Sequence, residues 1–433
     1  MPRRAPVASA RQWASGGMSA HSVNLASLES PAPATVGGSQ VEVTIVMPCL
    51  NEGDTVGICI EKAWGALRAR GIRGEIIIAD NGSTDGSQEI ARQREARVVE
   101  VADRGYGNAL RGGIAMAQGT WVIMGDADDS YDFSVIGDFV DRLHEGFDIV
   151  QGCRFPRGGG TVLPGAMPLL HRWWGNPMFT RMANMWFKVP VSDVYCGMRG
   201  FRRDFYNSLD LRCTGMEFAT EMLIKSSLFG GRIAEIPITL HRDGRVLRAP
   251  HLRTFRDGWR TLRFFLLYSP RWLFFTPGVF LIALGMAGYL LVLSRTTIRG
   301  IHFDAHSLLF FSLFVIMGYQ AVFFAVAAWT FATAEGLMPM SKALARWFGR
   351  IDLEKGLAAG ALSMVTGFVL LGHSVLAWRA TGYGDLDYSQ TMRWVIPGVT
   401  LTALGFQTLL SSFFLSVLGM RRPARTLPRP TCV

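Results

Sequence analysis

MGDADDSYDF, residues 124–133, continues the apolar run TWVIM at 120–124 and carries three aspartates, Asp126, Asp128 and Asp129, within four positions. The apolar run predicts a buried strand that delivers the chain to the acids. No basic residue lies among these acids, and neighbouring carboxylates repel one another unless a positive charge offsets them. The stretch therefore predicts a strand end that holds a cation.

Similar short β-branched runs recur at regular intervals before and after this stretch. We expect strands at 43–48, 75–80, 96–103, 120–126 and 147–152, separated by segments long enough for one helix each. Alternating strands and helices predict an α/β fold, a parallel sheet covered by helices on both faces. In such sheets, ligands bind beyond the carboxyl ends of the strands. Polar clusters follow four of these strands directly: PCLNE at 48–52, DNGSTDG at 80–86, DRGYGNA at 103–109 and DADD at 126–129.

The second half of the chain has a different composition. Hydrophobic residues make up 49% of the 433 residues, and the mean hydropathy is +0.22. Four long stretches are nearly free of charge: 273–293, 308–331, 357–377 and 395–417. Each is close to the ~20 residues that cross a bilayer, which predicts four transmembrane helices. Buried helices of a large soluble core are the alternative.

Basic residues predict how the four spans are oriented. They concentrate in the loop between the second and third spans (Lys342, Arg346, Arg350, Lys355) and after the fourth (Arg421, Arg422, Arg425, Arg429). The positive-inside rule therefore places both termini and the α/β part in the cytoplasm of a multi-pass membrane protein. The net charge of +10 suits a membrane surface better than nucleic acid, because the α/β part has no basic run with interleaved aromatics.

These patterns divide the chain into five segments. We expect a disordered tail at 1–40, an α/β domain at 41–250, an interfacial amphipathic helix at 251–270, a four-span domain at 271–420 and a basic cytoplasmic tail at 421–433. The six cysteines include no CxxC pair and no zinc-like spacing, so we interpret them as reduced thiols.

The chemistry of the DADD cluster favours a hard divalent cation. Carboxylate oxygens suit Mg²⁺ or Mn²⁺, which usually keeps open positions for phosphate oxygens. The glycines of DRGYGNALRGG, at 103–113, allow a close approach of backbone to a ligand where a helix begins. A DxD alone is more often a solvated turn or a helix cap. Three further polar clusters at strand ends favour the metal and diphosphate site.

The motifs PCLNE, ADNGSTDGS and GDADD together resemble those of family 2 glycosyltransferases of GT-A fold. With the membrane helices that follow, the chain is similar to the polyprenyl-phosphate glycosyltransferases, which include dolichyl-phosphate mannose synthase. The resemblance covers about 41–263. It implies inverting transfer of a sugar from a nucleotide sugar to a polyprenyl phosphate.

The resemblance also implies roles for individual residues. The nucleotide sugar would be bound by Pro48, Leu50, Glu52, Asp80, Asn81, Asp126, Ala127, Asp128 and Arg154. The run HRDGR at 241–245 departs from the family's longer arginine-glycine-serine-lysine pattern, and we still expect Arg242 or Arg245 to close over the donor phosphates. Asp126 and Asp128 would hold the metal with Ser130, which stands where a Gln is common, so a third protein ligand is uncertain. Arg172 and Asn176 would contact the acceptor phosphate, and Asp126, Asp128 and Arg172 would carry the catalysis.

Two segments have the character of membrane-surface helices. LLHRWWGNPMFTRMANMWFK at 169–188 and HLRTFRDGWRTLRFFLLY at 251–268 combine arginines with aromatic and aliphatic side chains. In the second, apolar residues recur at helical spacing with arginines largely off that stripe, which predicts a helix in the interface. An amphipathic helix packed on the α/β domain is the alternative for each.

The chemistry of the acceptor separates the functional hypotheses. A phosphate monoester is mostly ionised near neutral pH, so its attack needs no dedicated base. The first hypothesis is transfer to polyprenyl phosphate, with UDP-glucose as the default donor and GDP-mannose and UDP-N-acetylglucosamine open. The second is a hydroxyl-bearing lipid acceptor, which requires a carboxylate base such as Glu217 or Glu221; a solvated helix face is the plain alternative for both. The third is a non-catalytic lipid-sugar flippase or scaffold. Asp193 either orients the acceptor arginines or caps a loop.

Overall fold

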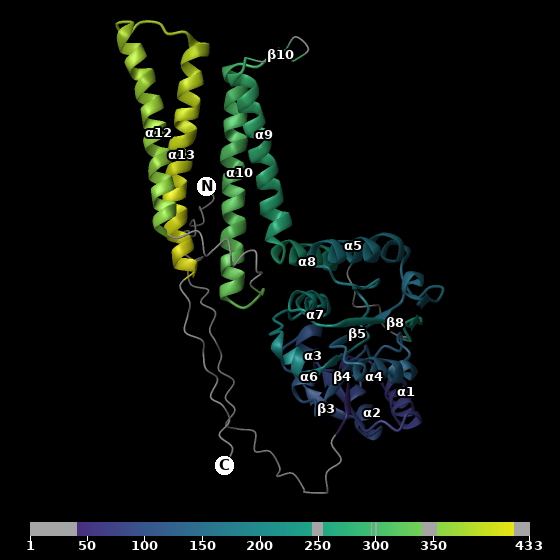
Figure 1. The fold of residues 1–433 in the computed structure, drawn as a ribbon. Helices are drawn as coiled ribbons and strands as arrows, with labels where there is room; N and C mark the ends of the chain where they lie inside the picture. Colours follow the sequence, from purple (N-terminus) through teal and green to yellow (C-terminus); the bar gives the residue numbers. More distant parts are fainter. Residues whose placement is uncertain (1–40, 245–253, 296, 299–300, 340–352, 420–433) are drawn as a thin grey trace, which may run out of the picture. The chain divides into compact units, whose positions relative to one another are not determined.

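The computed structural model describes residues 41–244, 254–295, 297–298, 301–339 and 353–419 (Figure 1). The expected tails at 1–40 and 421–433, and Arg245, lie outside these residues. The described residues form a mixed α/β domain followed by four long helices. The fold class expected from the sequence is therefore confirmed.

The main sheet has seven strands among the described residues, in the order β3-β2-β1-β4-β7-β5-β8. These are β1 (Val43–Cys49), β2 (Gly74–Asp80), β3 (Arg97–Glu100), β4 (Trp121–Met124), β5 (Ile149–Cys153), β7 (Arg199–Arg202) and β8 (Ile233–Pro237). Two small sheets pair β6 (Thr161–Val162) with β9 (Thr239–Leu240) and β10 (Thr297–Ile298) with β11 (Ile301–His302). All five expected strands are present.

The expectation of a wholly parallel sheet is wrong at one strand. β7 lies between β4 and β5 and runs antiparallel to both. Its sequence, RGFR, is short and charged, which is typical of a loop rather than a central strand. Arg199 is nonetheless fully buried, because its guanidinium donates to the carbonyls of Cys196 and Ala219. These two hydrogen bonds offset part of the cost of burying a charged residue inside a sheet, although its Nε is buried without a hydrogen-bond partner.

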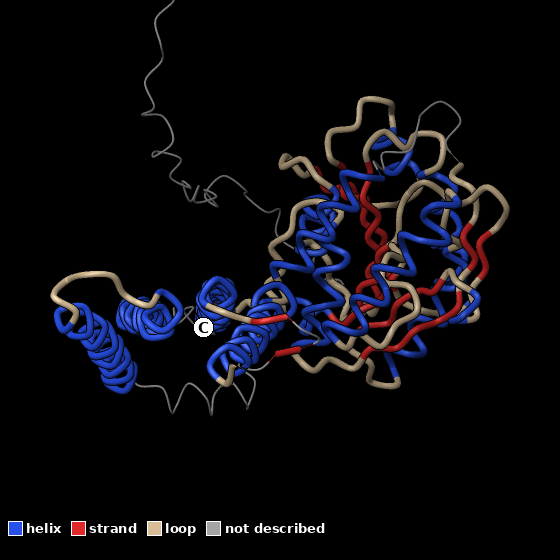
Figure 2. The backbone as a smooth tube through the Cα atoms, turned by 90° about the horizontal axis from the view of Figure 1, so that it is seen from above, coloured by secondary structure: helices blue, strands red, loops and turns tan. Residues whose placement is uncertain are grey.

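Helices cover both faces of the sheet, as Figure 2 shows for the strands in red between helices in blue. The helices of the α/β domain are α1 (Val56–Ala69), α2 (Ser87–Gln93), α3 (Tyr106–Ala115), α4 (Ile136–His144), α5 (Asn176–Phe187), α6 (Arg203–Ser208), α7 (Glu217–Leu228) and α8 (Thr254–Leu267). Alternate residues of β1 enter different cores: Val43, Ile45 and Met47 face α1 and α4, whereas Val46 faces α3. This is the period of two that a strand requires.

The parallel strands bring three chain segments to one edge of the sheet. Cys49, the last residue of β1, is in register with Asp80, the last residue of β2. Met124, the last residue of β4, pairs with Val46 on the other side of β1. The polar clusters that follow β1, β2 and β4 therefore meet at the carboxyl edge of the sheet.

The two segments expected at a membrane surface pack on the α/β domain and also expose apolar side chains. Phe265 of α8 is buried against Phe179 and Phe187 of α5, whereas Trp259 is 62% exposed. Before α5, the turn His171–Gly175 presents Trp173 and Trp174 at 69% and 74% exposure. One face of α8 therefore packs on the α/β domain, as the alternative expected. The location of both segments in the membrane interface stays a prediction.

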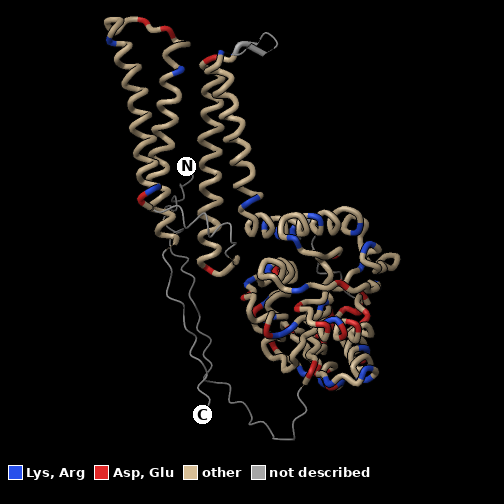
Figure 3. Tube along the Cα trace, viewed as in Figure 1, with Lys and Arg blue, Asp and Glu red and all other residues tan. Residues whose placement is uncertain are grey.

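Four helices among the described residues are long and apolar enough to cross a membrane. They span Arg271–Leu293, Ala305–Ala334, Leu353–Ala380 and Tyr388–Gly419, and they include α9 (Thr276–Leu293), α10 (Ala305–Ala334), α12 (Leu353–Ala380) and α13 (Tyr388–Gly419). Their charged residues lie near the helix ends (Figure 3). Each of the four expected spans is confirmed as a helix.

Glycines set the close packing of α12 on α13. A Cβ on Gly360 would lie 2.9 Å from the Gly405 carbonyl oxygen, and one on Gly367 would lie 2.7 Å from that of Gly398. The two glycines of each helix are separated by seven residues, or two turns. Small residues at this spacing let the helix backbones approach, as is common in membrane helix pairs.

Candidate active site at the carboxyl edge of the sheet

The acids of the DADD loop are held by specific hydrogen bonds. Asp126 Oδ1 accepts a hydrogen bond from the Tyr106 hydroxyl at 2.9 Å. Asp128 Oδ1 accepts from the backbone N–H of Ser130 at 3.1 Å and from its hydroxyl at 2.6 Å. The two carboxylates of the DxD are therefore oriented by groups of the protein before any ligand binds.

The third acid has a positive partner that the sequence pattern does not indicate. Lys62 Nζ on α1 lies 2.7 Å from Asp129 Oδ1. The hydrogen bond to Asp129 raises the pKa of Lys62, which keeps the ammonium charged. Part of the positive charge expected beside the acids is thus the Lys62 ammonium. Asp129 pairs with Lys62, which leaves the DxD pair of Asp126 and Asp128 for a metal.

Neighbouring segments hold the backbone of the same loop. The buried Thr55 hydroxyl donates to the Ala127 carbonyl at 2.7 Å. The backbone N–H groups of His241 and Gly244 donate to the carbonyls of Ser130 and Asp128, each at 2.9 Å. The run HRDG at 241–244 therefore lies on the DADD loop, next to the donor site expected from the sequence.

The carboxylates of Asp126 and Asp128 fit a divalent cation that is bound jointly with a diphosphate. The described residues contain no group of three His, Cys, Asp or Glu side chains arranged around a metal position. Mg²⁺ sites built on one or two carboxylates, with phosphate oxygens and water completing the octahedron, do not need such a group. The Ser130 hydroxyl is hydrogen-bonded to Asp128, so its evident effect is to orient that carboxylate.

Asp80 presents an unsatisfied acceptor at the end of β2. Its side chain is fully buried, and Oδ2 accepts hydrogen bonds from Gly82 N and Ser83 N at 3.0 Å and from Gln88 Nε2 at 2.7 Å. Oδ1 is buried without a hydrogen-bond partner. A buried carboxylate oxygen without a donor is costly, and an N–H or O–H of a ligand would satisfy Oδ1.

The other residues expected at the nucleoside differ in what they offer a ligand. Pro48 lies in β1, and Leu50 just beyond it is 37% exposed. Glu52 is buried, and its backbone N–H donates to Ser87 Oγ. The Asn81 side chain is occupied within the protein, since it donates to the carbonyls of Val101 and Asp103 and accepts from Gly105 N. Asn81 therefore fixes the loop after β3.

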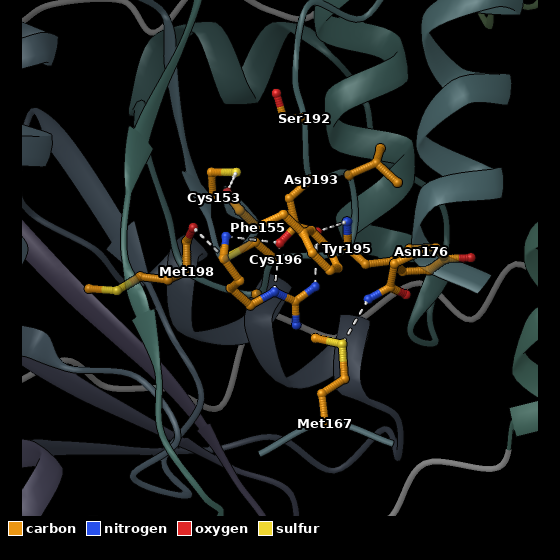
Figure 4. A network of polar contacts seen from close by, with 12 residues as sticks. Cys153, Phe155, Met167, Asn176, Ser192, Asp193, Tyr195, Cys196 and Met198 are labelled. Atoms are coloured by element: carbon orange, nitrogen blue, oxygen red, sulfur yellow. Dashed lines mark hydrogen bonds and ion pairs between the residues drawn. The ribbon is translucent and has the colours of Figure 1, made fainter. Parts of the chain in front are cut away.

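Arg154 forms a buried ion pair with Asp193. Its Nε lies 2.6 Å from Asp193 Oδ2 and its Nη2 lies 2.9 Å from Oδ1, a bidentate arrangement. The nearby carboxylate raises the pKa of Arg154 against the opposing effect of burial. Asp193 also accepts from Tyr195 N, so it caps its loop as well (Figure 4). Asp193 therefore neutralises most of the positive charge of Arg154, which was expected to face the nucleotide sugar.

The expected acceptor-phosphate residues lie at the start of the α5 segment. Arg172 stands over the Trp173 ring with Cζ 5.8 Å from its centroid, and within the described residues no carboxylate is paired with it. The Asn176 amide donates to Met167 Sδ at 3.5 Å (Figure 4). Arg172 is thus a cation surrounded by exposed tryptophans.

Of the two arginines predicted to close over the donor phosphates, the structure describes Arg242. Arg242 is exposed, and its Nε donates to the Pro164 carbonyl at 2.7 Å. In this arrangement it faces the 163–167 loop. Arg245 lies outside the described residues.

Both candidate carboxylate bases lie beside a cation of the protein. Glu221 is fully buried and lies 3.1 Å from Lys225 Nζ, which is also fully buried. Its oxygens accept hydrogen bonds from Arg212 N, Cys213 N and the Tyr268 hydroxyl. Glu217 lies 3.8 Å from Arg260 Nε, with 16% of its side chain exposed. The arrangement is that of structural acids.

Comparisons with known proteins agree with this geometry. Residues 44–210 match the model of glycosyl transferase family 2, and residues 326–419 match that of the glycosyltransferase family 2 C-terminal transmembrane region. The low-salt glycan biosynthesis hexosyltransferase Agl6 of Haloferax volcanii is 33% identical over 423 residues, 96% of this chain and 98% of that protein. The chain belongs to glycosyltransferase family 2.

Other relatives and solved structures match about half of the chain. The dolichyl-phosphate hexose transferase of Haloferax volcanii is 33% identical over 198 residues, 46% of this chain and 82% of that protein. Glucosyl-3-phosphoglycerate synthase from Mycobacterium tuberculosis, solved with Mn²⁺, UDP and phosphoglyceric acid, has 21% identity and a TM-score of 0.40 over 52% of this chain and 76% of that one. That likeness is too low to bear on substrate. The protein is a family 2 membrane glycosyltransferase with a GT-A-like domain.

Proposed function

We propose that the protein transfers a hexose from a nucleotide sugar to a polyprenyl phosphate at the cytoplasmic face of the membrane. UDP-glucose is the default donor. One observation carries the proposal. The DxD pair, Asp126 and Asp128, follows β4, and the unpartnered oxygen of Asp80 ends β2, at the same edge of the sheet.

Asp80 supports the donor side of this function. An acceptor-only carboxylate oxygen suits the N–H of a pyrimidine imide, as in uracil, and equally the N1–H of guanine. Gln88 and two backbone N–H groups hold the other oxygen of Asp80, so the carboxylate is pre-oriented. The Asp80 carboxylate would therefore recognise the nucleobase from a fixed position. The uracil of a UDP-sugar and the guanine of a GDP-sugar both offer the N–H that it needs.

Asp126 and Asp128 are proposed to hold Mg²⁺ or Mn²⁺ together with the donor diphosphate. When bound, the metal neutralises the charge that develops on the departing diphosphate. Tyr106 and Ser130 orient the two carboxylates. Lys62 reduces repulsion within the loop by pairing with Asp129.

The acceptor side rests on Arg172. Arg172 is a cation with no paired carboxylate in the described residues, among the exposed Trp173 and Trp174. An ionised phosphate monoester attacks without deprotonation, so no catalytic carboxylate is required. Two relatives are named as a hexosyltransferase and a dolichyl-phosphate hexose transferase, which favours a hexose and a polyprenyl-phosphate acceptor.

The reaction follows from these positions. An oxygen of the lipid phosphate attacks the anomeric carbon of the sugar while the bond from that carbon to the diphosphate breaks. A single displacement inverts the anomeric configuration. Arg172 and Asn176 are proposed to hold the acceptor phosphate, and Arg154, Arg242 and Arg245 remain candidates on the donor side.

The proposed division of the chain matches this reaction. The α/β domain at 41–250 works at the cytoplasmic face, the 251–270 segment lies in the interface, and the spans at 271–420 anchor the enzyme near its lipid. The basic loop between the second and third spans supports this orientation.

A transfer assay tests the proposal. Purified protein receives polyprenyl phosphate or diacylglycerol, Mn²⁺, and a panel of radiolabelled UDP- and GDP-sugars, and the organic phase is counted before and after mild acid. The proposal requires acid-labile label with polyprenyl phosphate, lost in Asp128→Asn. Acid-stable label with diacylglycerol alone would establish the hydroxyl-acceptor reaction, and no transfer to either lipid would contradict both.

A further inference from the structure

The Tyr106 hydroxyl is hydrogen-bonded to the first aspartate of the DxD. It lies 2.9 Å from Asp126 Oδ1, to which it donates. Tyr106 is the first residue of α3, which begins inside the glycine-rich run at 103–113 that follows β3. A proton donor on one oxygen of a carboxylate restricts rotation of that carboxylate, which fixes where its other oxygen points.

The N-terminus of α3 is held against the chain near Thr214. The N–H groups of Gly107 and Asn108 donate to the Thr214 carbonyl at 2.9 and 3.3 Å. Gly105 has φ +135°, and a Cβ on Gly107 would lie 2.8 Å from the Cys213 carbonyl oxygen. Tyr106, between these two glycines, therefore has little freedom to move away from Asp126.

The segment that receives α3 is itself fixed from inside the domain. Glu221 Oε2 accepts the Cys213 N–H at 2.7 Å, and Glu221 pairs with Lys225, both fully buried. Lys225 Nζ also donates to the carbonyls of Leu209 and Asp210. We call residues 209–214 the clamp loop. Its polar groups are satisfied by a buried network, which makes it a rigid support.

We propose that Tyr106 is a positioning residue that orients Asp126 toward the metal and diphosphate of the donor, with the clamp loop holding Tyr106 in place. The inference rests on the proposed metal role of Asp126 and Asp128. The hydrogen bond from Tyr106 holds Asp126 Oδ1, which fixes the direction in which the other oxygen of that carboxylate points. Asp128 has its own orienting group in Ser130.

Thermodynamic linkage between metal and nucleotide tests the proposal without an activity assay. UDP and GDP are titrated by calorimetry into the full-length protein in Mn²⁺ and in EDTA, and the tighter nucleotide is used. The measured quantity is the gain in nucleotide affinity that Mn²⁺ provides. Tyr106→Phe removes only the hydroxyl. Tyr206→Phe is the matched control, because Tyr206 stacks on Phe201 and lies on α6.

We expect Tyr106→Phe to reduce the Mn²⁺-dependent gain at least tenfold, the usual cost of losing a group that orients a metal ligand. Nucleotide affinity in EDTA should be unchanged, and Tyr206→Phe should keep the full gain. A full gain in Tyr106→Phe, with the gain lost in Asp128→Ala, would overturn the positioning role and leave the proposed function intact. A full gain in Asp128→Ala would overturn both.

Discussion

Lys62 Nζ on α1 lies 2.7 Å from Asp129 Oδ1, in the loop that follows β4. The contact joins residues 67 positions apart and supplies a positive charge beside the three acids. Asp129 has φ 59°, a left-handed conformation that Asp adopts more readily than most residues. The pair therefore fixes the turn of the DADD loop and separates the charge of Asp129 from the DxD.

A double-mutant cycle measures this pair. Lys62→Met and Asp129→Asn should couple by about 0.2 to 1 kcal/mol in unfolding free energy, since both side chains are partly exposed. The single Lys62→Met variant should also need less Mn²⁺ for half-maximal activity, because the uncompensated Asp129 makes the potential at the DxD more negative. Additive effects on stability and an unchanged Mn²⁺ requirement would show that the contact has no role.

Asp80→Asn should weaken nucleotide binding about tenfold to a hundredfold, in line with the ~1.5 to 3 kcal/mol of a hydrogen bond to a charged group. The amide cannot accept from both the base and the groups that now bind Oδ2. Calorimetric titration with UDP measures the effect. Asp54→Asn, at an exposed position, is the control and should bind normally. Equal affinity in both variants would remove Asp80 from the nucleoside site.

Glu221→Ala should destabilise the protein by about 3 to 5 kcal/mol, because it leaves the buried Lys225 charge unpaired. Glu217→Ala removes a longer and partly exposed contact and should cost less than about 1 kcal/mol. Thermal unfolding in detergent measures both. Glu217→Gln should also retain transfer activity; its loss in a folded variant would favour the hydroxyl-acceptor reaction.

Gly360→Leu should destabilise the α12–α13 pair by about 1 to 3 kcal/mol, because the new side chain meets the Gly405 backbone. Gly372→Leu on the same helix is the matched control, since a Cβ there meets nothing within 4 Å. Melting temperatures in a mild detergent compare the two. A larger loss in the Gly372 variant would contradict the packing described here.

Local patterns predicted most of the elements. The five expected strands alternate with helices, and the four spans are long uninterrupted apolar stretches, so both signals lie within single segments. β7 and β8 were not among the expected strands. The strand character of β7 depends on distant partners, because the buried Arg199 donates there to the carbonyls of Cys196 and Ala219.

The same limit applies to the site. The DADD cluster and Asp80 follow their strands directly, so the sequence indicates that they share one edge. Lys62 and Thr55 reach the DADD loop from α1 and its N-cap, and no short motif encodes that contact. Arg154 and Glu221 have the charges expected of binding or catalytic residues, but burial beside Asp193 and Lys225 satisfies those charges inside the protein.

The bond that the enzyme forms is the most direct test of the proposed function. Nuclear magnetic resonance of the lipid product, made from polyprenyl phosphate and a donor labelled with ¹³C at the anomeric carbon, reports that bond. The account predicts an anomeric carbon coupled to the phosphorus of the lipid, with the configuration opposite to that of the donor. An anomeric carbon without phosphorus coupling, or with the donor's configuration retained, would contradict it.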